Sequence, residues 1–244
     1  FFFFLRIMAV SFSLLEIEAL APGLDTAASW QQWRQDGCWP EAASLPATPL
    51  IPAMTARRMS QSARLAVQLA LQLLARWQPR HLICVSRHGE LARTFTLLQK
   101  LIQQQPLSPT DFSMSVHNTV AGLTTIVGQQ PLPASSLAAG VDSFQAGLLE
   151  ACATLQAAAG PVLLLYFEGA LPDFYQPWVC VPEPAHAIGM VLEVGEQWRY
   201  SGLEAQAVSP LNQGLTFWRG YLQGAQHVCL PGARGGHGWS CAAS

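Results

Sequence analysis

The sequence is poor in charged side chains and has no excess of positive ones. Charged residues make up 11% of the 244 residues, and the net charge is −2 at pH 7. Arg57 and Arg58 stand side by side, but two charges do not form the broad basic surface that binds a phosphate backbone. We therefore expect no nucleic-acid partner.

Closely spaced cysteine pairs are also missing, although the chain has six cysteines. None belongs to a Cys-x-x-Cys pair, which fits reduced thiols in the cytoplasm better than a disulfide framework. His227, Cys229, His237 and Cys241 have the side chains that zinc prefers. Their spacings match no common zinc finger, and the glycines around them predict a flexible end. We predict a cytoplasmic protein with no metal and no cofactor.

An apolar run opens the chain, but it is too short to cross a membrane. Residues 1–15 resemble the core of a signal peptide, yet Glu16 and Glu18 follow without a convincing cleavage site. We therefore expect no membrane span and interpret residues 7–17 as the first strand of a globular domain.

Hydrophobic side chains are abundant, at 50% of the chain. A chain of this length with this composition can bury an extensive core. Because so few charges remain for the surface, we also expect another subunit to cover part of it. The composition therefore favours an oligomer.

Segments typical of strands and helices alternate along the chain. A short helix is expected around Trp30 and Trp33, followed by a loop rich in proline. Polar residues at spacings of three and four predict a mostly buried helix over residues 55–77. Residues 82–85 are typical of a buried strand, and residues 90–104 return to a helical pattern.

Two further strand-to-helix units are expected. The first covers residues 113–127, with Asn118 placed to cap the helix. The second has a strand at residues 135–138, a turn at Ala139 and Gly140, and a helix over residues 142–158. That helix is almost entirely Ala, Leu, Gly and Cys, which predicts burial on all sides. Strands at residues 162–167 and 187–194 and a helix at residues 211–222 complete a single α/β domain with a layered sheet over residues 1–244.

Several segments, in this order, resemble the N-terminal half of a β-ketoacyl synthase. They are Ser86 to Leu91, Ser108 to Asn118, Ala121-Gly122 and Gly140 to Gly147. The chain is most similar to the short ketosynthase-like proteins of the chain-length-factor type that accompany aryl polyene ketosynthases. The resemblance covers residues 7–169. It implies a thiolase-like α/β/α fold truncated to about the N-terminal half, with a core at 1–170 and a short divergent extension at 171–244.

The resemblance also implies that the catalytic nucleophile is absent. A condensing enzyme has a cysteine where Ala139 stands, and alanine cannot hold an acyl thioester. The two histidines of the family's second half are not matched by His186, His227 or His237. We therefore predict no catalytic residue.

Other nucleophiles near the turn are better explained by structure. Cys152 is expected well inside the buried helix, where an apolar setting raises the pKa of a thiol. Ser135, Ser136 and Ser143 lie closer to the turn, but no adjacent base is evident to activate a hydroxyl. We interpret all four as packing or hydrogen-bonding residues.

The function implied is that of a non-catalytic, chain-length-factor-like subunit. It would form a heterodimer with a full-length ketosynthase, shape the acyl tunnel of that enzyme, and meet acyl carrier protein through the complex. The products would be of the aryl polyene, polyketide or fatty-acid type. The resemblance assigns the tunnel to His88, Phe112 and Met114, and the interface strand to Ser135, Ser136, Leu137 and Ala138.

An alternative function is a small enzyme that acts alone. Arg87-His88 directly after a strand resembles the phosphohistidine motif of histidine phosphatases, in which the histidine attacks phosphorus and the arginine binds its oxygens. That motif normally follows the first strand, and no second histidine with basic neighbours is evident. A stand-alone acyltransferase is the other enzymatic interpretation.

Overall fold

The computed structural model describes residues 10–41, 43–178, 183–205 and 209–242, which form one mixed sheet flanked by helices. The strands lie in the order β3-β2-β4-β5-β7-β6, and β1 also pairs with β5. Their bounds are β1 Ser11–Leu20, β2 His81–Val85, β3 Ala134–Leu137, β4 Val162–Glu168, β5 His186–Glu204, β6 His227–Leu230 and β7 Gly236–Cys241.

The sheet is parallel at its β3-β2-β4 side and antiparallel at its β5-β7-β6 side. β2 runs parallel to β3 and to β4, whereas β5 runs antiparallel to β4, β1 and β7. Parallel neighbours need crossovers on the faces of the sheet, and here the crossovers are helical. The helices are α1 Ala27–Asp36, α2 Ala53–Ala56, α3 Gln61–Trp77, α4 Leu91–Ile102, α5 Pro109–Ser113, α6 Thr119–Val127, α7 Ser143–Ala157 and α8 Gln213–Leu222, with 3₁₀ turns η1 Gly140–Asp142 and η2 Asp173–Trp178.

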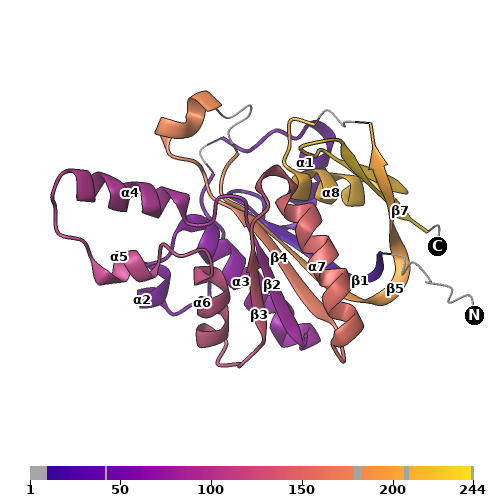
Figure 1. Cartoon of the computed structure of the whole chain (residues 1–244), viewed down its shortest axis with the longest axis horizontal. Coiled ribbons are helices and arrows are strands. Elements are labelled where there is room, and N and C mark those ends of the chain that lie inside the picture. Colours follow the sequence, from indigo (N-terminus) through magenta and orange to yellow (C-terminus); the bar gives the residue numbers. More distant parts are fainter. Residues whose placement is uncertain (1–9, 42, 179–182, 206–208, 243–244) are drawn as a thin grey trace, which may run out of the picture.

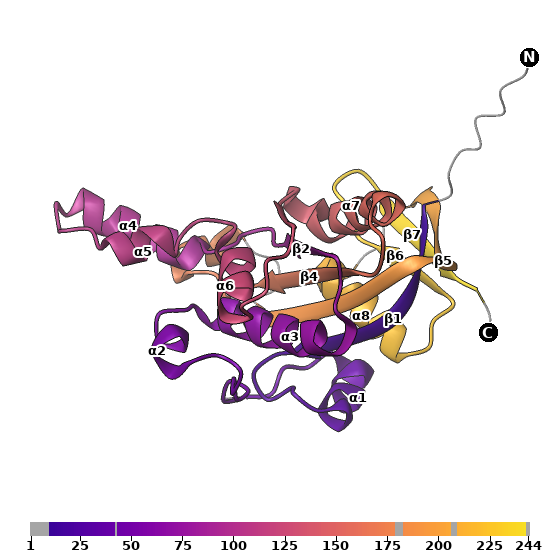
Figure 2. The ribbon, with the colours of Figure 1, turned by 90° about the horizontal axis from the view of Figure 1, so that it is seen from below.

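Helices cover both faces of the sheet, and this confirms the predicted α/β/α layers. Alternate side chains of β4 point to opposite faces: Leu163 and Leu165 pack with α3 and α6, whereas Val162 and Leu164 pack with α7. Figure 2 shows α3 and α7 on opposite sides of the strands. A strand buried on both faces reads as a continuous apolar run, which is why β4 could be predicted.

The longest helix, α3, packs very closely against the sheet. A Cβ on Gly189 of β5 would lie 2.5 Å from Leu73 Cδ1 of α3, so this contact requires glycine. The helix begins at Gln61 and not at residue 55, because the short α2 ends before it and the Ser60 hydroxyl accepts the N–H of Ala63 as its N-cap. Its burial is as predicted.

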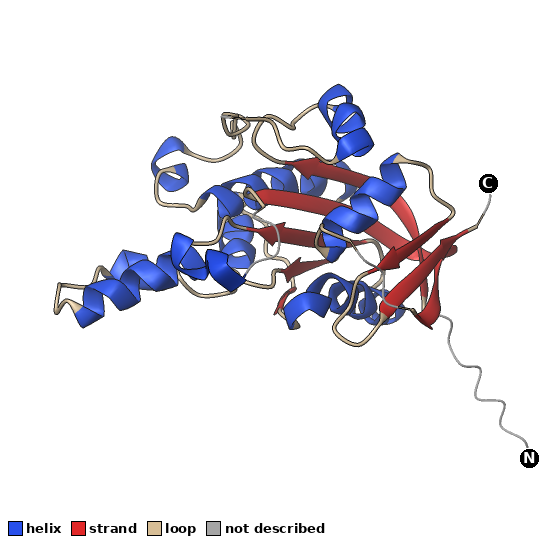
Figure 3. Cartoon of the chain, turned by 90° about the horizontal axis from the view of Figure 1, so that it is seen from above, coloured by secondary structure: helices blue, strands red, loops and turns tan. Residues whose placement is uncertain are grey.

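Helices α4 and α5 project from the body as an arm (Figures 1 and 3). Arg93 and Lys100 of α4 hold the two helices together through Asp111 of α5, at 3.0 and 3.3 Å. In α4 the side chain of Leu97 is the buried one among the described residues. We call α4, α5 and the loop between them, residues 91–113, the helical arm.

Three of the predicted elements are wrong in part. Residues 113–118 form no strand, because α5 leads directly to α6, and the side chain of Asn118 makes no capping hydrogen bond. The first strand begins at Ser11, and residues 7–9 of its predicted range lie outside the described residues. Helix α7 is not buried on all sides, since Leu149 is 40% exposed and Ala153 is exposed on its outer face.

The C-terminal end is a pair of strands and not a flexible tail. β6 pairs with β7, and β7 pairs with the far half of β5. Gly236 and Gly238 are buried. His227, Cys229, His237 and Cys241 lie on these strands, and the described residues contain no cluster of metal-ligating side chains. No described helix has both the length and the apolar character that a membrane crossing needs.

Candidate functional site

Ala139 lies at a sharp turn between the end of β3 and the start of α7. The turn continues through η1, where Gly140 has a φ of 61°, a left-handed conformation that favours glycine. The hydroxyl of Ser143 accepts the N–H of Ala139 at 2.9 Å and donates to the carbonyl of Gly140 at 2.7 Å. The hydroxyl of Ser143 therefore holds the turn closed, in agreement with the hydrogen-bonding role predicted for it.

The residue at the point of the turn between strand and helix is alanine, which has no reactive group. Residue 139 precedes a helix of fifteen residues, whose N-terminal end favours negative charge. The methyl group of Ala139 cannot attack a carbonyl. Cys152 is 6% exposed, and burial raises the pKa of its thiol to about 12. Burial raises the pKa of Cys84 to about 12 as well, so neither thiol supplies a thiolate at neutral pH.

The C-terminal strands reach back to this turn through Asp142. Its Oδ1 atom accepts from Gln213 Nε2 and from the N–H of Ala233, each at 3.2 Å, and lies 3.3 Å from His237 Nε2. His237 Nδ1 lies 3.2 Å from the hydroxyl of Tyr200. Sequence reasoning missed this network because its members come from η1, α8 and two late strands, and no local pattern joins them.

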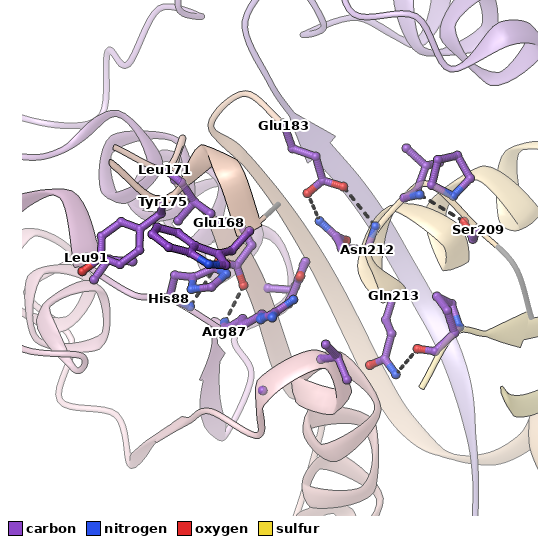
Figure 4. A pocket seen from close by; sticks show the side chains of 18 of the residues that line it. Arg87, His88, Leu91, Glu168, Leu171, Tyr175, Glu183, Ser209, Asn212 and Gln213 are labelled. Carbon is purple, nitrogen blue, oxygen red and sulfur yellow. Dashed lines mark hydrogen bonds between the residues drawn. The ribbon is translucent and has the colours of Figure 1, made fainter. Parts of the chain in front are cut away.

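A cavity of about 990 Å³ opens beside the turn (Figure 4). Gly140 and Val141 form one part of its wall, and Arg87 and His88 enter from the end of β2. The remaining walls come from the end of β4, from η2, from the start of α8 and from residues 231–233. These segments are far apart in the sequence, so the cavity is a product of the fold.

A buried carboxylate, Glu168, organises the floor of the cavity. It accepts the N–H groups of Arg87 and His88 and the hydroxyl of Ser86. Burial raises the pKa of Glu168 to about 7, although the backbone N–H groups of Arg87 and His88 act to lower it. Glu168 thus fixes the loop that follows β2. This function of Glu168 had no sequence signal, since the residue ends an apolar strand.

The predicted tunnel residues do not meet in one place within this chain. His88 lines the cavity, where burial and then the charge of Arg87 lower its pKa. Phe112 is 65% exposed on α5. Met114 directly follows α5 and packs, half-buried, against the core on the α3 side of the sheet. Phe112 in particular points out of this chain.

The predicted interface residues lie at the edge of the sheet. Ser135, Ser136 and Leu137 belong to β3, which pairs with β2 and ends the strand order. Ala138 follows the strand, is exposed, and leads into the turn. Within the described residues, the other edge of β3 has no pairing strand.

The histidine-phosphatase alternative finds little support in the cavity. His88 is the one histidine among the described residues that line it. His186 is completely buried: its Nδ1 donates to the carbonyl of Pro184, its Nε2 accepts from the side-chain amide of Asn212, and its ring stacks on Trp39. Burial lowers its pKa. Among the described residues that line the cavity, no second histidine for the phosphatase reaction stands beside His88.

Comparison with known proteins gives a consistent result. Residues 30–240 match the family described as β-ketoacyl synthase, N-terminal domain. This match extends well beyond residue 169, where the predicted resemblance ended. None of the curated proteins matches the chain.

Solved structures give the same result. A chain from the complex of the ketosynthase ApeO with its chain length factor ApeC, from Xenorhabdus doucetiae, is 38% identical, with a TM-score of 0.88 over 94% of this chain and 99% of that one. The ishigamide ketosynthase/chain length factor has 15% identity and a TM-score of 0.61, over 88% and 74%. A β-ketoacyl synthase from Burkholderia phymatum has 12% identity and a TM-score of 0.58, over 87% and 69%. The fold is thus thiolase-like, as predicted.

Proposed function

The chain belongs to the β-ketoacyl synthase family, and from this membership we propose that it is a non-catalytic, chain-length-factor-like subunit of a ketosynthase complex. One observation carries the proposal. The turn between β3 and α7 is intact and hydrogen-bonded, but Ala139 occupies it. A framework that keeps its shape without its reactive group is suited to supporting a neighbour.

The free edge of β3 supports pairing with a full-length ketosynthase. An unpaired edge presents backbone N–H and carbonyl groups that another strand can bond. Ser135, Ser136, Leu137 and Ala138 would form this junction, so that the sheets of the two subunits become continuous. The exposed Leu149 on α7 is a second apolar group that such a partner would cover.

The helical arm supports a contact with the acyl tunnel of the partner. α4 is strongly amphipathic, yet several apolar side chains of the arm are exposed to solvent. Exposed apolar patches on a protein surface mark interaction sites. Phe112 is the best placed of the three tunnel residues because its side chain is 65% exposed. Met114 packs against the core, and His88 remains a tunnel residue only in this proposal. The exposed apolar residues of the arm are Leu98, Leu101, Ile102, Leu107 and Phe112.

The proposed mechanism is indirect and needs no cofactor. A cysteine of the partner carries the growing acyl chain and receives units from malonyl-acyl carrier protein. This chain, acting as one domain, completes the dimer and closes the tunnel, so that bulky side chains limit product length. Products of the aryl polyene type, or more broadly of the polyketide and fatty-acid types, belong to the same proposal.

Co-expression with a ketosynthase tests the proposal. We expect a stable one-to-one complex by size-exclusion chromatography with light scattering, and no acyl mass on this chain after incubation with acyl-carrier thioesters. Changing Ala139→Cys should not make the isolated chain a condensing enzyme. A monomer that forms no complex with the ketosynthase and gains a covalent acyl or phosphoryl group would support the stand-alone enzyme instead.

A further inference from the structure

The rim of the cavity carries two largely exposed aromatic rings, one of which, Phe174, also stacks on Phe95 of α4. Trp178 is 72% exposed and Phe174 is 58% exposed, and their ring centroids lie 5.7 Å apart. Tyr175 lies 5.1 Å from Phe174, edge to face. Large aromatic side chains are seldom left this open at a concave surface unless something packs on them. The rim therefore offers flat surfaces on which a planar group can stack.

The floor of the cavity contains an unpaired positive charge. Arg87 is exposed, and Figure 4 shows its side chain extending into the middle of the cavity. Its guanidinium forms no hydrogen bond or ion pair with any of the described residues. Guanidinium groups bind carboxylates through two parallel hydrogen bonds, so this one is available to an anionic ligand.

The acidic groups of the cavity do not neutralise Arg87. Two carboxylates line the cavity among the described residues, Glu168 and Glu183. Glu168 is occupied by Ser86 and by the backbone N–H groups at the end of β2. Glu183 accepts the N–H of Asn212 at 3.0 Å and its side-chain amide at 2.5 Å. Neither lies within ion-pair distance of the guanidinium.

The remaining lining is neutral or apolar. Burial and then the charge of Arg87 lower the pKa of His88, which favours the neutral imidazole, a hydrogen-bonding group. Leu91 and Leu171 complete the apolar side, next to the aromatic rim. A volume of about 990 Å³ is in the range of cavities that enclose small ligands.

We propose that this cavity binds a flat, conjugated carboxylate, whose planar body stacks among Phe174, Tyr175 and Trp178 while its carboxylate accepts from Arg87. This goes beyond the proposed function, because it requires no partner, thioester or chemical step. It places a small-molecule site on this subunit itself, in the cavity that the proposed tunnel residue His88 also lines.

Binding can be measured on the full chain with trans-cinnamate, by isothermal titration calorimetry and by tryptophan fluorescence. Two matched probes separate the contributions. Cinnamamide keeps the planar body without the charge, and 3-cyclohexylpropanoate keeps the charge without the planar body. We expect cinnamate to bind at least about tenfold more tightly than either probe. Cinnamamide loses the charge-assisted hydrogen bond, and 3-cyclohexylpropanoate loses the ring stack.

Substitutions then assign the binding to this site. Arg87→Met should weaken the binding of cinnamate about tenfold and leave the binding of cinnamamide unchanged. Trp178→Leu should weaken the binding of cinnamate more than that of 3-cyclohexylpropanoate. Arg57→Met, an exposed arginine outside the cavity, is the matched control and should change nothing. Absence of saturable binding, or equal losses in R57M and R87M, would overturn the proposal. Pairing with the ketosynthase is read separately by chromatography, so the two proposals can fail independently.

Discussion

At the scale of single residues, the most consequential side chain is one that does not contact its own core. Phe112 is 65% exposed, so its packing contributes little to the stability of this chain. The proposed function gives it a role in the partner's tunnel instead.

Phe112→Ala should lengthen or broaden the product distribution of the ketosynthase complex, because a large ring no longer ends the tunnel. Mass spectrometry of the released acyl chains measures this. Ile126→Ala, which shortens another exposed apolar side chain on α6, serves as the control. Identical products from both variants would remove Phe112 from the tunnel.

Glu168 predicts a pH dependence of stability. Burial raises its pKa in the folded chain from 4.5 to about 7. The protonated form is thus favoured by folding, so the stability that this group contributes is complete below pH 4.5 and is lost as the pH rises towards 7.

Relative to the wild type, Glu168→Gln should gain unfolding free energy between pH 4.5 and pH 7, by roughly 3 kcal/mol at most. Urea unfolding at several pH values measures this difference. Glu193→Gln, at an exposed carboxyl group on β5, is the control and should show a flat difference. If the difference in unfolding free energy between Glu168→Gln and the wild type also did not change with pH, the raised pKa would be contradicted.

At the scale of elements, the helical arm leaves several apolar side chains exposed, which supports the proposed contact with a partner. Its inner connections are the ion pairs at Asp111 and the stacking of Phe95 on Phe174, with ring centroids 5.4 Å apart. The arm projects from the body (Figure 3), and its exposed apolar side chains are Leu98, Leu101, Ile102, Leu107 and Phe112.

Ile102→Glu should leave the unfolding free energy within about 0.5 kcal/mol, because this side chain is 81% exposed. It should weaken the complex with the ketosynthase at least about tenfold, since a charge would be buried where an apolar group was. Surface plasmon resonance measures the affinity. Gln103→Glu is the control, because it adds the same charge at the next position, which is also exposed. Unchanged affinity of the I102E variant for the ketosynthase would exclude the arm from the interface.

Sequence patterns predicted the elements that are buried on both sides and failed where the chain is held by distant contacts. The continuous apolar run of β4 and the polar spacing of α3 are local signals. The glycines of the C-terminal end were interpreted as flexible, but Gly238 is a residue of close approach: a Cβ there would lie 2.0 Å from Glu204 Oε1. The cavity could not be predicted, because Arg87, Glu168 and Trp178 meet only after folding.

At the scale of the whole molecule, the C-terminal strands are part of the core. Trp239 of β7 is 0% exposed, its ring centroid lies 5.4 Å from that of Phe12 in β1, and its Nε1 donates to Gln145 Oε1 of α7 at 2.7 Å. One side chain therefore joins the first strand, the central helix and the last strand.

Trp239→Ala should cost about 3–5 kcal/mol of unfolding free energy, because it leaves a cavity in the core and an unpaired acceptor on Gln145. Denaturant unfolding checks this. Trp178→Ala, the same change at a side chain that is 72% exposed, should cost far less. Equal costs would mean that the C-terminal strands do not contribute to the core.

The hydrogen bond between Ser143 and the turn also bears on what a thiol at residue 139 could do. In acyl transfer, a backbone N–H beside the attacking atom typically stabilises the oxyanion of the tetrahedral intermediate. The N–H of Ala139 is already committed to the hydroxyl of Ser143. Under the proposed function, a condensing activity would thus require freeing this amide in addition to placing a thiol at residue 139, so Ala139→Cys alone is not expected to confer one.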